Sequence, residues 1–257
     1  MKRTILLSVV LAVLLSIACG ATGLGAKYNW YCLHKGNGKA PECPAEMDFI
    51  EKENGIFLDR RAAEDPDHPV IYLTFDAGYE NGNIEKILNV MKEENVKGSF
   101  FILKNLVQRN SGLVKRMADE GHAVCNHTAN HKDMTLLGES AFRRELRELE
   151  EIYRDCTGKE LSRFYRPPEG KFTKSNLRLA HEMGYDTVFW SFAYADWDND
   201  RQPDPAAAKA KILSNTHNGE IILLHPTSST NAAILSELIK EWKSMGFRFA
   251  TLDELKK

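Results

Sequence analysis

Apolar runs with the composition of β-strands alternate with segments of helical periodicity along most of the chain. Residues 70–75 form a β-rich apolar run, and residues 83–94 carry apolar side chains at helical spacing. The same alternation continues toward the end of the sequence. Further strands are expected at residues 98–103, 122–126, 163–165, 187–191, 220–224 and 247–250. Further helices are expected at residues 111–120, 139–156, 173–183, 205–215, 231–245 and 252–257.

The breaks in this pattern predict the fold class. Glycine follows four of the expected helices, at Gly121, Gly184, Gly219 and Gly246, where a helix C-cap favours it. Seven strand–helix units in one run predict right-handed crossovers and a parallel sheet. With seven units, an α/β chain that closes into an irregular barrel is favoured over an open doubly wound sheet. No G-x-G-x-x-G follows the first strand, so dinucleotide binding has no support.

The segment before the regular pattern is expected to be an irregular N-terminal arm, residues 27–66, on a domain that spans residues 67–257. Tyr28, Trp30 and Tyr31 in the arm are expected to pack against that domain, or else to form a platform for a sugar ring. The packed arrangement is favoured because aromatic rings are large apolar surfaces.

The first 26 residues have the parts of a secretory signal. Lys2 and Arg3 precede an apolar run over residues 5–18, and mostly small residues follow. This run is short of the roughly 20 apolar residues that span a bilayer. Export to the cell envelope or extracytoplasmic space is therefore expected, with an uncleaved anchor as the alternative. Cys19 would suit a lipoprotein, but Ser16 stands where that signal usually has leucine.

Charge and size narrow the range of partners. The formal net charge is −2, and loss of the two basic residues of the signal lowers it to −4. A mildly acidic chain without a basic block argues against nucleic acid as a partner. The remainder of the chain fits one barrel-sized domain that can bury a sizeable core, and we expect a monomer.

Cys32, Cys43, Cys125 and Cys156 remain after the signal, and export makes disulfides permissible. Cys32 and Cys43 flank the polar residues 34–41 and could close a small loop, although pairing cannot be read from sequence. Cys125 lies in a strand-like run and is expected to behave as a small hydrophobe. Cys156 receives no assignment.

Five motifs with chemically active side chains each come directly after an expected strand. They are Thr74-Phe75-Asp76-Ala77-Gly78, His127-Thr128-Ala129-Asn130-His131, Arg166-Pro167-Pro168-Glu169-Gly170, Asp196-Trp197 and Leu224-His225-Pro226. The carboxyl ends of parallel strands open on one side of a barrel, and α/β barrels place their chemistry there. An aspartate, a histidine pair, an arginine and a further histidine converging at that side suggest metal-assisted hydrolysis.

His127 and His131 are the candidate metal ligands. They are four residues apart, so a helical turn would place both imidazoles on one face, where they can bind one divalent ion. An isolated pair of loop histidines would more often form hydrogen bonds or caps. The presence of Asp76 and His225 at equivalent strand ends favours the metal.

Asp76 ends a strongly apolar strand, where a carboxylate acts as a helix N-cap, a metal ligand or a general base. His225 is a candidate general acid, although alone it would be read as a hydrogen-bonded core histidine. Arg166 and Asp196 could form a charge pair, with the arginine also touching a carboxylate such as Asp76. The other histidines lack such positions and are expected to be ordinary: His34, His68, His122, His181 and His217.

With these motifs the chain resembles the polysaccharide deacetylases (carbohydrate esterase family 4) over about residues 68–255. All five ordered motifs of that family are present in recognisable form. The chain looks closest to the muramic-acid de-N-acetylases that make the δ-lactam of spore cortex peptidoglycan. The segments that carry this closeness are residues 74–82, 126–131, 166–170 and, in the arm, 37–41.

The resemblance implies a distorted, incomplete (β/α)7 barrel and an exported hydrolase that removes N-acetyl groups from peptidoglycan amino sugars. By that likeness Asp76 corresponds to the catalytic base and His225 to the catalytic acid. Arg166 and Asp196 correspond to residues that orient the base and tune its partners. Two alternatives stay open: a non-catalytic glycan-binding envelope protein, and a deacetylase of chitin-like or other acetylated glycans.

The resemblance also implies a divalent ion, Zn with Co or Mn as alternatives, held by His127 and His131. This chain departs from most members, which have a second aspartate, the third metal ligand, where Ala77 stands, and commonly an aspartate at Ala193. Losing one anionic ligand should weaken ion binding. The neighbouring Glu80-Asn81 pair or water are candidates to fill the place. The branch that the chain most resembles shares the alanine at 77, so the change does not by itself imply inactivity.

Overall fold

The computed structural model describes residues 25–256. Residues 1–24 of the predicted signal lie outside the described part, and with them the predictions on cleavage, anchoring and Cys19. No helix of the described chain combines the length and apolar character that a membrane span requires.

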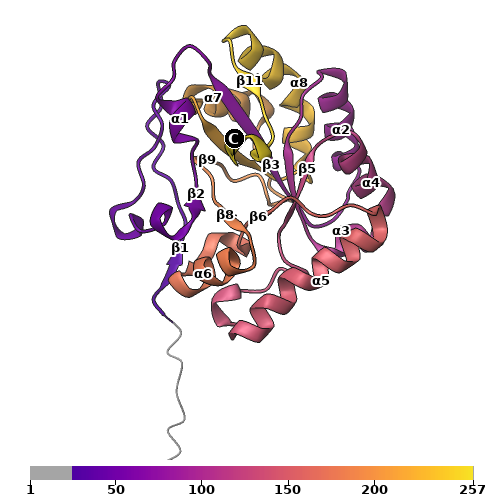
Figure 1. Cartoon of the computed structure of the whole chain (residues 1–257). Coiled ribbons are helices and arrows are strands. Elements are labelled where there is room, and N and C mark those ends of the chain that lie inside the picture. Colours follow the sequence, from indigo (N-terminus) through magenta and orange to yellow (C-terminus); the bar gives the residue numbers. More distant parts are fainter. Residues whose placement is uncertain (1–24, 257) are drawn as a thin grey trace, which may run out of the picture.

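A curled parallel sheet forms the centre of the molecule (Figure 1). Its strands lie in the order β2-β8-β6-β5-β4-β3-β10-β9, and β11 pairs with the beginning of β3. Each of these strand pairs is parallel. The strands are β2 Gly55–Ile56, β3 Val70–Ala77, β4 Ser99–Ile102, β5 Ala123–Asn126, β6 Phe164–Tyr165, β8 Asp186–Val188, β9 Phe192–Ala193, β10 Glu220–Leu224 and β11 Arg248–Phe249.

The strand order explains why the barrel is incomplete. On one side of β3 the strands β4, β5, β6 and β8 lie side by side in chain order, and β2 pairs with β8. On the other side of β3 lie β10 and then β9, so β2 and β9 are the two edge strands of the sheet. An isolated antiparallel bridge between Leu58 and Glu220 joins the arm to the far half. The sheet thus curls without a β2–β9 ladder in the described residues. This architecture confirms the predicted distorted, incomplete barrel.

Helices cover the outer face of the curl (Figure 1). The expected helices all form with boundaries within a few residues, except that the last expected one is a 3-10 turn, Leu252–Lys256. Residues 104–109 were not expected to be helical, and the short strands of the arm and of residues 192–193 were also missed. The α-helices are α1 Arg60–Ala63, α2 Asn83–Glu93, α3 Lys104–Arg109, α4 Ser111–Asp119, α5 Glu139–Thr157, α6 Lys174–Glu182, α7 Pro205–Asn215 and α8 Ser229–Ser244.

Alternation along β3 fixes which side chains reach the interior. Successive strand residues point to opposite faces. Ile71 and its alternate neighbours, ending at Ala77, join the apolar cluster under the helices. Val70 and Tyr72 join a separate cluster inside the curl. Asp76 has the same parity as these two, so its carboxylate lies on the inner face at the carboxyl end of the strand.

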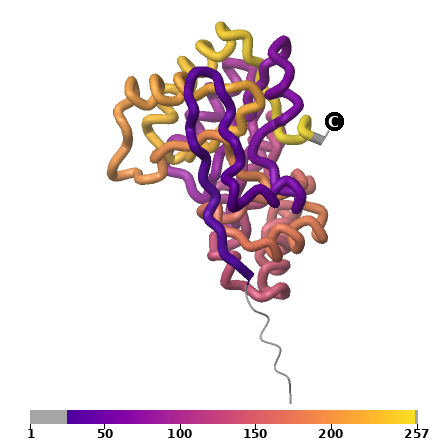
Figure 2. Tube along the Cα trace, turned by 90° about the vertical axis from the view of Figure 1, so that its left-hand side faces the viewer, coloured from indigo at the N-terminus to yellow at the C-terminus, as the bar shows by residue number. Residues whose placement is uncertain are grey.

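The N-terminal arm packs on the open side of the barrel. Figure 2 shows it in indigo, running along the side of the molecule that faces the viewer. β1 (Lys27–Asn29) pairs antiparallel with β7 (Lys171–Thr173), and β2 pairs with β8. Trp30 is 5% exposed, as expected for packing, whereas Tyr31 is 43% exposed and donates a hydrogen bond to Glu46.

The cysteines of the arm do not form a disulfide. Cys32 and Cys43 are both free thiols, so the open possibility of a closed loop is decided against. The Cys43 thiol instead donates to the Met47 carbonyl at 3.2 Å. Cys125 is fully buried in the interior cluster, in agreement with its expected apolar role.

Candidate active site

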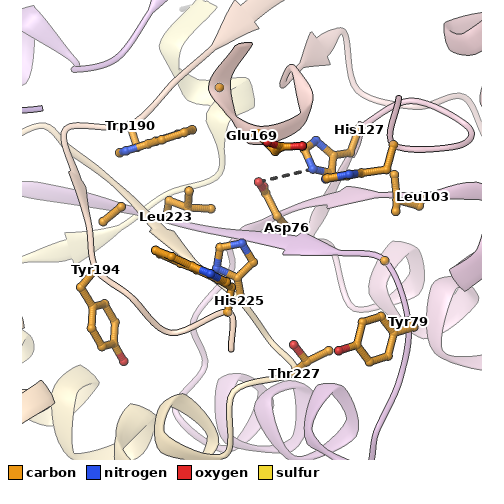
Figure 3. Close-up of a pocket in the computed structure, with 15 residues that line it drawn as sticks. Asp76, Tyr79, Leu103, His127, Glu169, Trp190, Tyr194, Leu223, His225 and Thr227 are labelled. Carbon is orange, nitrogen blue, oxygen red and sulfur yellow. Dashed lines mark ion pairs between the residues drawn. The ribbon is translucent and has the colours of Figure 1, made fainter. Parts of the chain in front are cut away.

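The five motifs meet around one pocket at the carboxyl end of the curled sheet. Its volume is about 750 Å³, and Asp76, His127, His131 and His225 are among the residues that line it. Figure 3 shows their side chains, apart from the unlabelled His131, directed into this cavity from different strands. The convergence that parallel topology predicts is therefore present: Asp76 is the penultimate residue of β3, His127 and His131 follow β5, and His225 follows β10.

Arg166 holds the Asp76 carboxylate. Its Nη1 donates to Asp76 Oδ1 at 2.8 Å, while Nε and Nη2 donate to the carbonyls of Val188 and Phe189, each at 3.1 Å. Its guanidinium is fully buried and lies 4.1 Å from the centre of the Phe101 ring. The arginine thus has one charged partner and a fixed orientation. The suggested pairing of Arg166 with Asp196 is wrong, because the buried guanidinium is committed to Asp76 and the two carbonyls.

The charges around Asp76 favour its ionised form. Burial by itself raises the pKa of this carboxyl, but the Arg166 charge, together with His127 and His225, outweighs burial and brings the net pKa below its ordinary value. The second oxygen, Oδ2, lies 3.5 Å from His127 Nε2. Asp76 can therefore accept a proton in the pocket while one oxygen stays bound to the arginine.

His127 has its lone pair directed toward the pocket. Its Nδ1 donates to the Arg166 carbonyl at 2.8 Å, so in this tautomer the unprotonated Nε2 faces Asp76. Burial lowers the pKa of His127 to about 4, which keeps the ring neutral at pH 7. A neutral imidazole with a free nitrogen is the form that binds a metal.

His131 lies beside His127, with 5.0 Å between ring centroids. The connecting backbone is not the regular helical turn that the spacing suggested, because Thr128 and His131 have positive φ values of 75° and 53°. Two side chains tie the turn together: Asn126 accepts from the Thr128 amide, and the Thr128 hydroxyl accepts from the His131 amide. The loop therefore brings the two rings together by turns rather than by helical periodicity.

The two imidazoles fit a divalent ion through two nitrogen donors. Within residues 25–256 no group of three or more His, Cys, Asp or Glu side chains is arranged to hold a metal. Ala77 is packed under the helices, Glu80 accepts from the Gly82 and Ile84 amides, and Asn81 donates to the Thr227 carbonyl. The suggested replacement of the missing ligand by Glu80 or Asn81 is thus opposed by the contacts that both side chains already make.

Asp196 holds His225 on the other side of the pocket. Its Oδ1 accepts from His225 Nδ1 at 2.7 Å, and its Oδ2 accepts from the His225 amide at 2.8 Å and from Asn231 Nδ2 at 2.6 Å. Burial lowers the pKa of His225, but the Asp196 hydrogen bond and charge outweigh burial and raise it above the ordinary value. The ring can therefore carry a proton on Nε2 near neutral pH.

Sequence reasoning missed Asn231 and Trp190. Asn231 lies in the first turn of α8, where an asparagine suggests a capping role, and its side chain instead bridges Asp196 and the His225 carbonyl. Trp190 lines the pocket and places its ring 5.8 Å from the Arg166 guanidinium. Neither position carries a motif that would distinguish it from an ordinary cap or core residue.

These groups define a class of molecule: an incomplete α/β barrel whose strand ends gather a carboxylate and histidines suited to hydrolysis. A model of the polysaccharide deacetylase family matches residues 63–188. The peptidoglycan-N-acetylmuramic acid deacetylase PdaA of Bacillus subtilis is 36% identical over 229 residues, which cover 88% of this chain and 85% of PdaA. A peptidoglycan-N-acetylglucosamine deacetylase of Bacillus cereus is 32% identical over 189 residues, covering 72% of this chain and 67% of that protein.

The solved structures agree with these sequence matches. The structure of Bacillus subtilis PdaA, described as a family 4 carbohydrate esterase, has a TM-score of 0.84 at 35% identity. The match covers 90% of this chain and 97% of the PdaA chain. The chain therefore belongs to the polysaccharide deacetylase family, a class of hydrolases that remove acetyl groups from sugars.

Proposed function

We propose that this protein is an exported hydrolase that removes N-acetyl groups from peptidoglycan amino sugars. The observation that carries the proposal is that one pocket holds two ionisable side chains whose pKa values are shifted in opposite directions. Arg166 lowers the pKa of Asp76 and so favours its ionised form, and Asp196 raises the pKa of His225 and so favours its protonated form. Amide hydrolysis needs a base that takes a proton from the attacking water and an acid that gives a proton to the leaving nitrogen, and opposed pKa shifts suit two groups to these roles.

In the proposed reaction, Asp76 takes a proton from the water that attacks the acetamide carbonyl carbon. His225 then gives its Nε2 proton to the amide nitrogen as the carbon–nitrogen bond breaks, which yields acetate and a free amino sugar. Arg166 keeps Asp76 fixed, and Asp196 stabilises the imidazolium before transfer. His127 and His131 would hold the divalent ion, Zn or alternatively Co or Mn. When bound, such an ion supplies Lewis-acid polarisation of a carbonyl oxygen.

We further propose N-acetylmuramic acid as the sugar, on the way to muramic δ-lactam in spore cortex. The match to PdaA over most of both chains supports this choice, and the shorter match to an N-acetylglucosamine deacetylase names the main competing sugar. The signal-like first 26 residues support action in the cell envelope, where that glycan lies.

Mass spectrometry of digested cell-wall glycan tests the proposal. After incubation with the purified protein, muramic acid residues should lose the mass of an acetyl group, while glucosamine residues and chitin oligomers should change less. Asp76→Asn should abolish the reaction, since asparagine cannot accept the proton. A chelator added in parallel measures how far turnover depends on a metal ion. Full activity of Asp76→Asn would remove this carboxylate from the mechanism.

A non-catalytic glycan-binding role is the second candidate, and Ala77 in place of a metal ligand is the feature that favours it. Such a protein would bind peptidoglycan fragments without releasing acetate, and added Zn²⁺, Co²⁺ or Mn²⁺ would change nothing. Acetate release by the wild type in the mass-spectrometric assay would exclude this candidate.

A further inference from the structure

The family model begins at residue 63, yet part of the pocket wall is fixed by the arm that precedes it. Trp30 is the point of contact. Its indole Nε1 donates to the Trp190 carbonyl at 2.9 Å, and its amide donates to the Gly170 carbonyl at 2.9 Å. Trp190 and Gly170 both line the pocket, and they belong to segments that follow different strands.

Three consecutive carbonyls connect this contact to the base. Those of Val188 and Phe189 accept from Arg166, and that of Trp190, the next residue, accepts from Trp30. The arm strand β2 adds a further bond, because the Phe189 amide donates to the Ile56 carbonyl at 2.7 Å. The segment 188–190 is therefore bonded both to the arm and to Arg166.

Packing makes the contact tight. The Trp30 ring lies 5.0 Å from the ring centroids of both Phe57 and Phe189. A side chain at Gly170 would place its Cβ 2.9 Å from the Trp190 ring and 3.3 Å from Trp30, and Gly170 also has a positive φ of 66°. The turn before β7 thus fits closely between the two tryptophans, so a shift of either one would move the pocket wall.

Resting on the proposed deacetylase function, we propose that Trp30 is a positioning residue of the active site. Its two donors fix Trp190 and Gly170, and through segment 188–190 they hold Arg166 where it orients Asp76. The functional unit then begins at β1 rather than at residue 63. Signal cleavage before Lys27 leaves this contact complete.

Kinetics of Trp30→Phe test the inference, because phenylalanine keeps a ring but lacks the indole donor. We expect kcat to fall about three- to tenfold, the equivalent of one lost hydrogen bond, with a change in KM below about twofold. Tyr31→Phe is the matched control on the same arm, since Tyr31 is exposed and its hydroxyl donates to Glu46, away from the pocket residues. An unchanged kcat in folded Trp30→Phe would overturn the proposal.

Hydrogen exchange provides a readout that does not depend on turnover. In Trp30→Phe the amides of residues 166–172 and 187–191 should exchange faster, while those of α2 and α8 keep their wild-type rates. Uniformly faster exchange would show a general loss of stability and would contradict a positioning role. Gly170→Ala should loosen the same two segments from the other side of the contact. If the wild type released no acetate, the proposed function would fail, and these exchange rates would still decide whether Trp30 fixes the wall.

Discussion

The strands β9 and β10 carry a histidine–acid network at each of their ends, and the two networks differ in kind. At the carboxyl ends, His225 binds the Asp196 carboxylate at 2.7 Å beside an open pocket. At the amino ends, His217 is 2% exposed, and its Nδ1 donates to the Asn215 carbonyl at 2.8 Å while Nε2 meets the Ser191 hydroxyl at 2.8 Å. Proximity of a histidine to an acid is therefore not enough to mark an active site.

The acid of each network shows the reason. Asp196 accepts three hydrogen bonds, so its charge is compensated although it is buried. Glu220 accepts one, from the His217 amide, and its Oε1 has no hydrogen-bond partner in the described chain. Burial raises the pKa of Glu220 well above its ordinary value and lowers that of His217. The end of the two strands at the pocket keeps a charged pair ready for proton transfer. The end with His217 and Glu220, which we call the sealed end because both side chains are buried, is neutral and structural.

Replacing the histidine at each end should separate the two networks most strongly. His225→Gln should lower acetate release by about 10²- to 10⁴-fold, the usual contribution of a general acid. His217→Gln, the same substitution at the sealed end, should retain activity and instead lose about 1–3 kcal/mol of unfolding free energy, because buried polar partners are left unsatisfied. Acetate release and urea unfolding measure the two effects. Comparable losses of activity in both variants would refute the distinction.

The buried ion pair at the pocket should give the next largest effect. Arg166→Met leaves the Asp76 carboxylate, whose side chain is only 10% exposed, without its cation, which should cost about 3–5 kcal/mol of unfolding free energy. Adding Asp76→Asn removes the uncompensated charge and should restore part of that loss. The double-mutant cycle is measured by urea unfolding. Additive losses would mean that the two side chains do not depend on each other.

Much of the active-site arrangement was predictable, because the side chains lie at the carboxyl ends of parallel strands that the apolar pattern reveals. The apolar run before Asp76 predicted β3, and parallel topology then predicted that the motifs after β5, β6 and β10 would share a pocket. The roles of these residues stay predictions. Partner choice was predicted only in part: the suggested contact of Arg166 with Asp76 is present, whereas its suggested pair with Asp196 is wrong, because Asp196 binds His225.

The strand pairing of the arm and the network at the sealed end were beyond sequence reasoning for a related reason. β1 and β2 are very short strands, and their pairing with β7 and β8 depends on contacts more than 100 residues away in the chain. His217 was read as an ordinary histidine, which agrees with its buried, hydrogen-bonded position. Glu220 is only three residues from His217 in the sequence, but nothing local indicates that Ser191 lies next to the imidazole, because the parallel pairing of β9 with β10 brings that residue close.

Removing the charge of Asp196 should produce a smaller, pH-dependent effect. The pKa of His225 is raised, so its acid form persists as pH increases and activity should fall only as pH passes that pKa. In Asp196→Asn the carboxylate that raises the pKa is gone, so the alkaline limb of the kcat profile should move to lower pH. A profile of acetate release between pH 5 and 10 measures this shift. An unmoved limb would show that another group titrates there.

The smallest effect on activity is expected at Glu220, where Glu220→Gln keeps the shape and removes the ionisation. The folded pKa of Glu220 lies above its unfolded value, so the wild type has its full stability below the unfolded pKa and loses it as pH rises toward the folded one. The glutamine variant has no such loss. The two proteins should unfold alike at acid pH, and the variant should gain about 1.4 kcal/mol per pH unit between the two pKa values. Urea unfolding at several pH values measures the difference, while acetate release should be the same for both. A difference in stability that does not grow with pH would mean that Glu220 ionises inside the fold with a partner, which would make the sealed end resemble the pocket end after all.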